Sequence, residues 1–377
     1  MTFAQPPLWF IVIAFLCAIG PLVFIHELGH YWVARWFGVG AEQFSIGFGR
    51  EIAGWTDKRG TRWKVGWLPL GGYVRFVGDM NPASQPDPDA AIPPEFRDVA
   101  FHLRPWWQRF LIVLAGPVAN FLLAIAIFAG FFAAFGAPQT PNVVAGVTAG
   151  SPAERAGLKI GDQILELDGR STPTFEMIGH VASLNPGETV VVRVQRASRQ
   201  LDLTATLAVV EETDHFGRHF RIGRLGIPNP GRKMVKVDAV DLIPTAVDRT
   251  YVLTRSMVEG LWQIISGRRS VRELGGPLKI AQIAGQQASL SWLDFVSLVA
   301  LISINLGFIN LLPVPMLDGG HLLFYVAEGI RRRPVSERAQ DWAFRGGLAL
   351  LLALLLFTTV NDLASFGLFE RLGRLIG

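Results

Sequence analysis

Three polar residues near the N-terminus are spaced as a metal site requires. His26 and His30 stand four residues apart, with Glu27 between them, in the pattern H-E-x-x-H. In a helix this spacing turns about 400° and places both imidazoles on one face, about 6 Å apart along the axis. Two imidazoles in this arrangement suit a single tetrahedral zinc ion. The pattern therefore predicts that His26 and His30 bind zinc, and it leaves a third protein ligand to be found.

Glu27 is predicted to move a proton and not to bind the metal. It lies about 100° around the helix from His26, so its carboxylate is poorly placed as a third ligand. It can act as a general base that takes a proton from the attacking water and passes it to the leaving amine. Zinc in such a site would lower the pKa of water to about 7 and polarise the carbonyl group.

The position of the pattern in the chain gives it weight. H-E-x-x-H also arises by chance on helix surfaces, but here it directly follows residues 8–25, which contain no charged side chain. A run of eighteen such residues is a candidate transmembrane helix. Ionisable side chains inside a membrane are costly and are functional hypotheses by default. The chance interpretation is therefore weak, since little in such a run would solvate three polar side chains.

Three more apolar runs indicate a membrane protein with four transmembrane helices. Of the 377 residues, 50% are hydrophobic and only 18% are charged, which is less charge than a soluble globular protein carries. The further uncharged runs cover residues 110–136, 295–317 and 346–361. The last is slightly short of a full span, but it can cross if the bilayer thins locally or if Arg345 reaches the interface.

A polar residue after the third run can complete the metal site. Residues 310–320 read N-L-L-P-V-P-M-L-D-G-G, and Pro313 and Pro315 cannot both lie inside a regular helix. Broken backbone at membrane depth is tolerated where it is buried in protein or lines a watery cavity. Asp318 follows this break and could either cap a helix at the interface or bind the metal. We favour the ligand, because two histidines need a third protein ligand and an open position for water.

Lysine and arginine residues predict the orientation of the chain. They are frequent between residues 35 and 109, and Arg331, Arg332 and Arg333 form a short cluster. By the positive-inside rule both segments are cytosolic. Residues 137–290 and both termini would then lie outside, in the periplasm of a bacterium, and the H-E-x-x-H pattern would lie toward the cytosol.

Two segments between the runs indicate β structure. Residues 70–76, L-G-G-Y-V-R-F, predict a strand entered through a glycine turn, within a small hairpin or sheet near the membrane. Residues 80–95 contain five prolines and several acids, which predicts a flexible loop. Residues 142–229 predict one soluble α+β domain, with a short helix that begins at Ser151, an alternating strand within residues 161–169, and a second strand at residues 189–194.

An amphipathic helix is predicted between the soluble domain and the third run. Within residues 241–266, apolar residues recur at helical spacing. This helix could lie on the outer membrane surface or pack on the soluble domain, and the sequence supports both equally. The expected segments, with a transmembrane helix in the first, third, sixth and last, are 1–37, 38–104, 105–137, 142–229, 230–290, 291–330, 331–345 and 346–377.

These segments resemble the site-2 protease family of intramembrane zinc metalloproteases, and most closely its bacterial regulator of sigma-E protease branch. The matching stretches, in the order of the family, are 26–30, 70–76, 116–121, 151–169, 276–281 and 310–320. The resemblance implies that His26, His30 and Asp318 bind Zn²⁺ and that Glu27 is catalytic.

The resemblance also implies where a substrate binds. Residues Gly71, Gly72, Tyr73 and Val74 would pair with an extended substrate, because adding a strand to an edge can unwind the end of a transmembrane helix. Asn305 and Asn310 match family positions that contact substrate, although each could instead form an interhelical hydrogen bond worth about 0.6 kcal/mol. We favour substrate contact for Asn310, which adjoins the break, and leave Asn305 open.

Two further polar residues are given more modest roles. Asn120 is expected to be structural. His321, one helical turn beyond Asp318, is expected to be an interfacial histidine more than a residue that supports a metal ligand.

The soluble domain resembles a PDZ domain of the circularly permuted bacterial type. The strand of the carboxylate-binding loop does not precede Ser151, and residues 224–227, R-L-G-I, supply a candidate for it at the other end of the domain. The resemblance implies that a peptide C-terminus faces the backbone of Gly223, Leu225, Gly226 and Ile227. Some family members carry two such domains. This chain has room for one, which puts size gating by a tandem pair in doubt.

The expected fold is thus a multi-pass α-helical membrane protein with four transmembrane helices, a membrane-associated β-hairpin and one inserted α+β PDZ domain. The resemblance implies regulated intramembrane proteolysis, by zinc, of single-span membrane proteins already shortened outside, such as an anti-sigma factor in a sigma-E stress response. The bacterial inner membrane supplies the lipid partner.

Other classes of function fit less well. A non-catalytic PDZ scaffold would not need Glu27, and a metal transporter would be expected to show internal repeats. No basic run interleaved with aromatic residues suggests a nucleic-acid partner.

Overall fold

The computed structural model describes residues 6–78, 93–213, 219–231, 233–267, 271 and 275–365. Most of the loop predicted at residues 80–95 and the end of the last predicted segment, residues 366–377, lie outside these ranges. The chain divides into two compact units. The helical unit comprises Met1–Ala129, Ala246–Trp262 and Ser270–Gly377, and the β-rich unit comprises Gly130–Thr245 and Gln263–Arg269.

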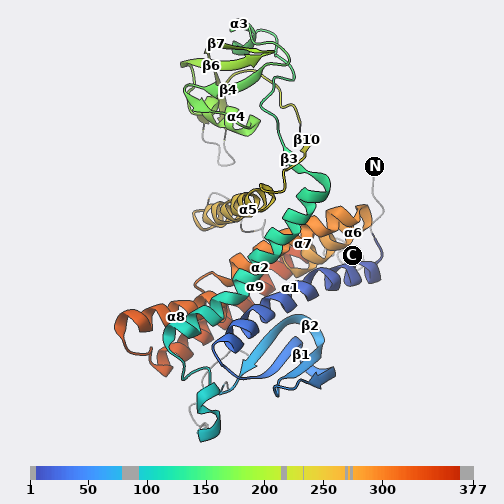
Figure 1. Ribbon diagram of the computed structural model, residues 1–377, viewed down its shortest axis with the longest axis vertical. Coiled ribbons are helices and arrows are strands. Elements are labelled where there is room, and N and C mark those ends of the chain that lie inside the picture. Colours follow the sequence, from blue (N-terminus) through green and yellow to red (C-terminus); the bar gives the residue numbers. More distant parts are fainter. Residues whose placement is uncertain are drawn as a thin grey trace, which may run out of the picture. The chain divides into compact units, whose positions relative to one another are not determined.

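Four helices of the described chain are long and apolar enough to cross a membrane, as predicted (Figure 1). They are α1 (Leu8–Trp36), α2 (Trp106–Phe135), α7 (Trp292–Asn310) and α9 (Glu337–Ser365). The prediction that residues 331–345 form a loop is wrong, because α9 already begins at Glu337. Residues 337–345 are rich in good helix formers, and the absence of charge marks the part of a helix that lies in lipid, not the helix itself.

The third predicted span is two helices. α7 ends at Asn310 and α8 (Asp318–Arg331) begins after a connection of seven residues, which includes Pro313 and Pro315. The backbone break at these prolines is therefore as predicted. Leu317 is the N-cap of α8, so Asp318 is its first helical residue and does not cap it.

Along the chain, two helices lie between β10 (Lys233–Val235) and α7. The predicted amphipathic helix is present as α5 (Leu242–Ile265), and its residues Ala246–Trp262 belong to the helical unit. Where the sequence predicts a linker, the structure has α6 (Pro277–Leu290). The start of α6 is capped from α9, since the buried Asp362 carboxylate accepts hydrogen bonds from the amides of Gly276 at 3.0 Å and Lys279 at 2.9 Å. This cap is remote in sequence, which is why the segment alone did not indicate a helix.

The hairpin of β1 (Ala41–Thr56) and β2 (Arg62–Phe76) does not turn where glycines predicted it. Its turn follows Asp57, whose Oδ1 accepts hydrogen bonds from the amides of Arg59 at 2.8 Å and Thr61 at 3.0 Å. Gly71 has φ +92° and lies inside β2, where the strand register shifts. Glycine therefore serves a bulge here and not a turn.

The bulges fold each strand back, so that four segments form one small sheet. Residues 41–46 pair with 72–76 on one side and with 62–65 on the other, and 62–65 also pair with 53–56. Residues 72–76 thus form an edge of the sheet. Phe44, in the segment of residues 41–46, stacks on Trp63 with ring centroids 4.3 Å apart and contacts Tyr31 of α1, which fixes the sheet on the first helix.

The β-rich unit contains the predicted short helix and both predicted strands. Ser151 caps the helix by accepting a hydrogen bond from the Glu154 amide at 3.3 Å, and the four-stranded sheet has the order β5-β4-β6-β7. Its core packs Ile164 and Val192 of this sheet against Ile178 of α4. The elements are β3 (Ala137–Gln139), α3 (Pro152–Arg155), β4 (Gln163–Leu167), β5 (Arg170–Ser171), α4 (Phe175–Ser183), β6 (Thr189–Arg196), β7 (Arg199–Thr206), β8 (Ala208–Thr213), β9 (His219–Arg224) and β10 (Lys233–Val235).

Candidate metal centre

The fold brings His26, His30 and Asp318 together. Both histidines lie on one face of α1, and Asp318 comes from the start of α8. The two Nε2 atoms are 3.2 Å apart, and Asp318 Oδ2 lies 3.1 Å from Nε2 of His26 and 3.6 Å from Nε2 of His30. Ligand atoms of a tetrahedral zinc ion with bonds of about 2.0–2.1 Å are about 3.3 Å apart. The three atoms thus have the mutual spacing of three zinc ligands.

The hydrogen bonding of these atoms also fits a cation. Both histidines are buried. Asp318 Oδ2 is buried and has no hydrogen bond of good geometry with any described residue. A buried acceptor without a partner is costly, and a cation between the carboxylate and the two imidazoles would satisfy it. Two neutral imidazoles and one carboxylate, with one position left open, form the donor set of a catalytic zinc site.

Helix α2 holds the ring of His30. His30 Nδ1 lies 2.9 Å from the carbonyl oxygen of Ile112, so Nδ1–H donates to that oxygen and Nε2 keeps its lone pair for a metal. Such a contact fixes both the tautomer and the orientation of a metal-binding histidine.

Asn120 holds the other ring, a role that the sequence did not indicate. Its side-chain amide lies 3.1 Å from His26 Nδ1. Metal binding through Nε2 requires a proton on Nδ1, and that proton needs an acceptor. The Asn120 oxygen has no hydrogen-bond partner among the described residues, and a 180° turn of the amide brings it to Nδ1–H. The signal in the sequence was a polar residue within an apolar run.

We expect Asn120→Ala to weaken zinc binding about 10- to 100-fold, because His26 would lose the acceptor that fixes its tautomer. The affinity can be measured by chelator competition on the purified protein. Ser303→Ala is the matched control, because Ser303 donates to the Asn120 backbone oxygen at 2.8 Å and not to the ring. Equal affinities of the two variants would contradict this role.

Two glycines make room for the histidine helix. A Cβ atom on Gly116 of α2 would lie 2.2 Å from His30 Nε2, and one on Gly29 would lie 2.4 Å from the Ala115 carbonyl oxygen. Helices α1 and α2 therefore approach closely at the metal centre, and only a residue without a side chain fits at either position.

A cavity of about 610 Å³ opens onto the three candidate ligands. Glu27 lines it, and the backbone of Val74 forms a hydrogen bond with the Glu27 carboxylate. Gly72 packs against the same side chain, since a Cβ there would lie 3.1 Å from Glu27 Cγ. The edge segment 72–76 of the small sheet thus runs along the general base, as a strand that positions an extended peptide must do. Further predicted residues that line this cavity are Gly71, Gly72, Tyr73, Val74 and Asn310.

Comparison with known proteins agrees with this geometry. The sequence pattern of Peptidase family M50 matches residues 14–354. This chain belongs to peptidase family M50. It is 42% identical over 359 residues to "Putative zinc metalloprotease mll0638" of Mesorhizobium japonicum, covering 93% of this chain and 98% of that protein. It is 38% identical over 390 residues to "Metalloprotease MmpA" of Caulobacter vibrioides, covering 97% and 98% respectively. The M50 chain is therefore a metalloendopeptidase of the site-2 type, and its apolar helices agree with a membrane protein.

Not every predicted residue of the M50 chain lies at the metal cavity. Asn305 lines a separate apolar cavity of about 220 Å³, together with Met257 of α5 and Ile280 of α6. His321, by contrast, lines the metal cavity and also a second cavity beside it. Asn305 and Asn310 both lie on α7, as predicted, but they line different cavities.

The residues predicted to bind a peptide C-terminus lie together in the β-rich unit. Gly223 pairs with Val209 in the β8–β9 hairpin, and the following residues leave the strand. The carbonyl oxygens of Leu225 and Gly226 accept hydrogen bonds from Ala153 and Thr148. The amides of Leu225, Gly226 and Ile227 have no backbone acceptor among the described residues. Three consecutive N–H groups can therefore donate to a ligand.

Proposed function

We propose that the chain is a zinc endopeptidase that cleaves single-span membrane proteins by regulated intramembrane proteolysis. The observation that carries this proposal is the cavity in which three candidate ligands, a general base and a sheet edge meet. His26, His30 and Asp318 would hold zinc, which would supply the Lewis acidity that activates water and polarises a peptide carbonyl.

Three other parts of the site would each have a role in cleavage. Glu27 takes the proton of the attacking water and delivers it to the leaving amine. Residues 72–76 add the substrate to the sheet as a strand, which holds the scissile bond extended beside Glu27. The amide of Asn310 satisfies backbone groups that the unwound helix of the substrate exposes where lipid cannot.

The charge distribution supports the orientation proposed above, with the metal centre toward the cytosol of a bacterial inner membrane. Arg331 is the last residue of α8, and Arg332 and Arg333 directly follow it. The first residue of the same helix is the candidate ligand Asp318. By the positive-inside rule this end of the helical unit is cytosolic. The cut would then release a cytosolic fragment, such as that of an anti-sigma factor in a sigma-E type stress response.

We further propose that the β-rich unit is one PDZ domain of the permuted type. The available amides at Leu225, Gly226 and Ile227 support a site for a carboxylate, and Gly223 places the end of β9 beside α4, since its Cβ would meet the carbonyl oxygen of Ala182. The ligand would be the new C-terminus that a first cut outside the membrane leaves on the substrate.

The proposal is tested by co-expressing the chain with a tagged single-span protein that has been shortened on its outer side. The wild type should yield a cytosolic fragment whose new terminus maps within or next to the span. Asp318→Ala should yield none, because a site with two histidines holds zinc poorly.

An identical fragment pattern in both strains would exclude Asp318 as a ligand. Ion flux without fragments would favour a transporter, and binding of the tagged protein without fragments would favour a scaffold.

A further inference from the structure

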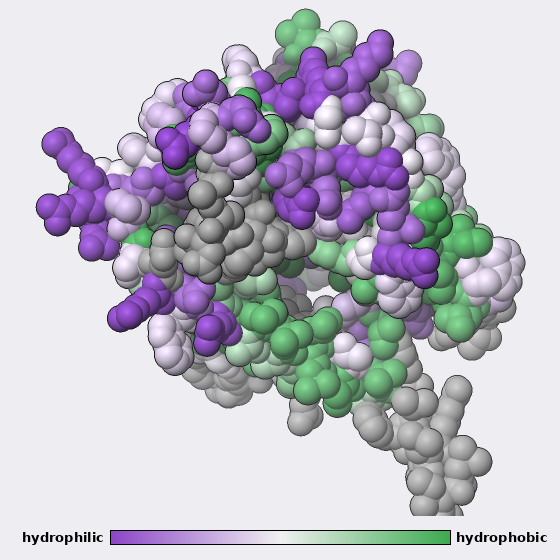
Figure 2. All heavy atoms as spheres, turned by 90° about the horizontal axis from the view of Figure 1, so that it is seen from below, coloured by the Kyte–Doolittle hydropathy of each residue, from purple (hydrophilic) through white to green (hydrophobic). Residues whose placement is uncertain are grey.

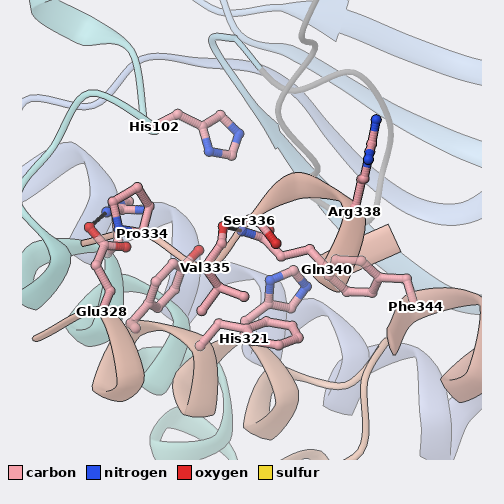
Figure 3. A pocket seen from close by; sticks show the side chains of 12 residues that line it. His102, His321, Glu328, Pro334, Val335, Ser336, Arg338, Gln340 and Phe344 are labelled. Carbon is pink, nitrogen blue, oxygen red and sulfur yellow. Dashed lines mark hydrogen bonds and ion pairs between the residues drawn. The ribbon is translucent and has the colours of Figure 1, made fainter. Parts of the chain in front are cut away.

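A second cavity, of about 670 Å³, lies beside the metal cavity in the helical unit (Figure 3). Helix α8 forms one side of it, with His321 and Glu328, and residues 334–340, which lead into α9 and include its first turn, form another. The lining is completed by His102, which precedes α2, and by Arg109 in the first turn of α2. The volume is in the range of sites that hold a small molecule or the head of a larger one. Nothing in the proposed proteolysis uses this cavity.

The cavity contains a fixed cation. Arg109 is largely buried, pairs with Glu328 at 2.6 Å and lies over the Tyr325 ring at 4.9 Å. Its Nε donates to the carbonyl oxygen of Arg104, which leaves Nη1 without an acceptor among the described residues. An arginine guanidinium has five donors in a rigid fork that matches phosphate and carboxylate oxygens. Arg109 is thus held in place with donors to spare.

A second, accessible arginine extends this site. Arg338 lines the cavity from the first turn of α9, is exposed, and forms no ion pair with a described side chain. Figure 3 shows it standing away from the cavity floor, above Gln340. Ser336 and Gln340 add polar groups to the same wall. Apart from the histidines, the lining carries two arginines against one glutamate, so an anion is favoured.

The neighbouring residues place the cavity at the level of a membrane surface. Trp106 and Trp107 at the start of α2 and Trp342 in α9 are exposed, and tryptophans of this kind concentrate at the interface between lipid and water. They flank the cavity residues Arg109 and Arg338 on the same two helices. Figure 2 shows hydrophilic residues gathered over part of the surface, with apolar residues beside them.

The apolar part of the lining distinguishes between phosphate sources. The cavity is also lined by the apolar side chains of Phe324, Val335 and Phe344. A free phosphate ion would make no apolar contact with them. Basic pockets between transmembrane helices on the cytosolic side bind the headgroups of anionic lipids. Therefore we propose that this cavity binds the phosphate-bearing headgroup of an anionic phospholipid, with Arg109 on the phosphate, Arg338 attracting the anion from the edge of the cavity, and the aromatic side chains against the glycerol and the first acyl carbons.

Lipid binding is tested on the full-length protein in detergent by native mass spectrometry, with phosphatidylglycerol and phosphatidylcholine as probes. Phosphatidylglycerol should bind more tightly, and Arg338→Gln should weaken it about fivefold. Arg345→Gln is the matched control, because Arg345 is an exposed arginine two turns further along the same helix, paired with Asp341, and does not line the cavity. It removes the same charge and should leave the affinity unchanged.

A second variant separates the cavity from the overall charge. Ser336→Trp would fill the cavity without changing any charge, and it should also weaken phosphatidylglycerol binding. Three results would overturn the proposal: equal affinity for the two lipids, equal effects of Arg338→Gln and Arg345→Gln, or full binding by Ser336→Trp. Displacement of the lipid by millimolar inorganic phosphate would also overturn it, in favour of a site for free phosphate.

Discussion

Replacing Glu27 with glutamine is expected to lower the rate of peptide-bond hydrolysis by about 10²- to 10⁴-fold, the usual contribution of a general base, while zinc stays bound. The substitution keeps the size of the side chain and an oxygen that can face the Val74 backbone. It removes only the group that can take a proton. Because the carboxylate points into the cavity and is not among the three clustered ligand atoms, the metal content should not change.

The measurement is a cleavage assay on purified protein together with its zinc content. Glu42→Gln is the matched control, since Glu42 is an exposed carboxylate of the same small sheet, paired with Arg75 at 2.7 Å. Exposed pairs contribute little, so this variant should retain both activity and zinc. If Glu27→Gln keeps activity within tenfold of the wild type, Glu27 is not the base. If it loses zinc, Glu27 belongs to the ligand set.

The ligands of the metal site could be predicted from the sequence, because each is marked by the residues next to it. The spacing of His26 and His30 follows from helix geometry, and Asp318 follows from the need for a third ligand beside a broken backbone. The four spans were also predicted, because long uncharged apolar runs are rarely anything else.

The contacts that support the ligands could not be predicted, because they join residues far apart in the chain. Ile112 meets His30 across 82 residues, and Asn120 meets His26 across 94. The cap that Asp362 places on α6 spans 86 residues. Asn120 and Asp362 are polar residues near or within apolar runs, but only the packing of the helices shows which group each of them contacts.

Two wrong predictions, a glycine turn before residues 72–76 and a loop at residues 331–345, have a different cause. Glycine permits positive φ in a turn and in a bulge alike, so Gly71 alone did not decide between them. The turn was set by Asp57, whose side chain bonds to backbone amides two and four residues on. Similarly, charge marks where a helix leaves the lipid and not where it ends, so α9 begins well before its apolar part.

Adding a single methyl group at Gly116 is expected to abolish zinc binding. In Gly116→Ala the new Cβ would lie 2.2 Å from His30 Nε2, the candidate ligand atom. The ring cannot simply rotate away, because its Nδ1–H is held by the Ile112 carbonyl oxygen, one turn earlier on the same helix. Either the ring leaves this bond or α2 moves away from α1. Both changes misplace a ligand, and we expect at least a 100-fold loss of zinc affinity, at the upper end of what disturbed ligand support costs.

Gly130→Ala provides the matched control on α2, because nothing lies within 4 Å of a Cβ at that position. Both substitutions replace glycine by alanine in a helix, which by propensity alone stabilises it by up to about 1 kcal/mol. Gly130→Ala should therefore keep zinc and unfold at an equal or higher temperature. Gly116→Ala should lose zinc without a matching loss of helix content by circular dichroism.

A double-mutant cycle shows whether the effect acts through the ring. If Gly116→Ala works by displacing His30, then adding it to His30→Ala should change zinc affinity no further, because the clashing side chain is already gone. Additive losses in the double variant would mean that Gly116 supports the site in another way. Unchanged zinc affinity in Gly116→Ala would mean that His30 does not bind the metal through the nitrogen that faces this glycine. The close approach of α1 and α2 would then serve packing alone.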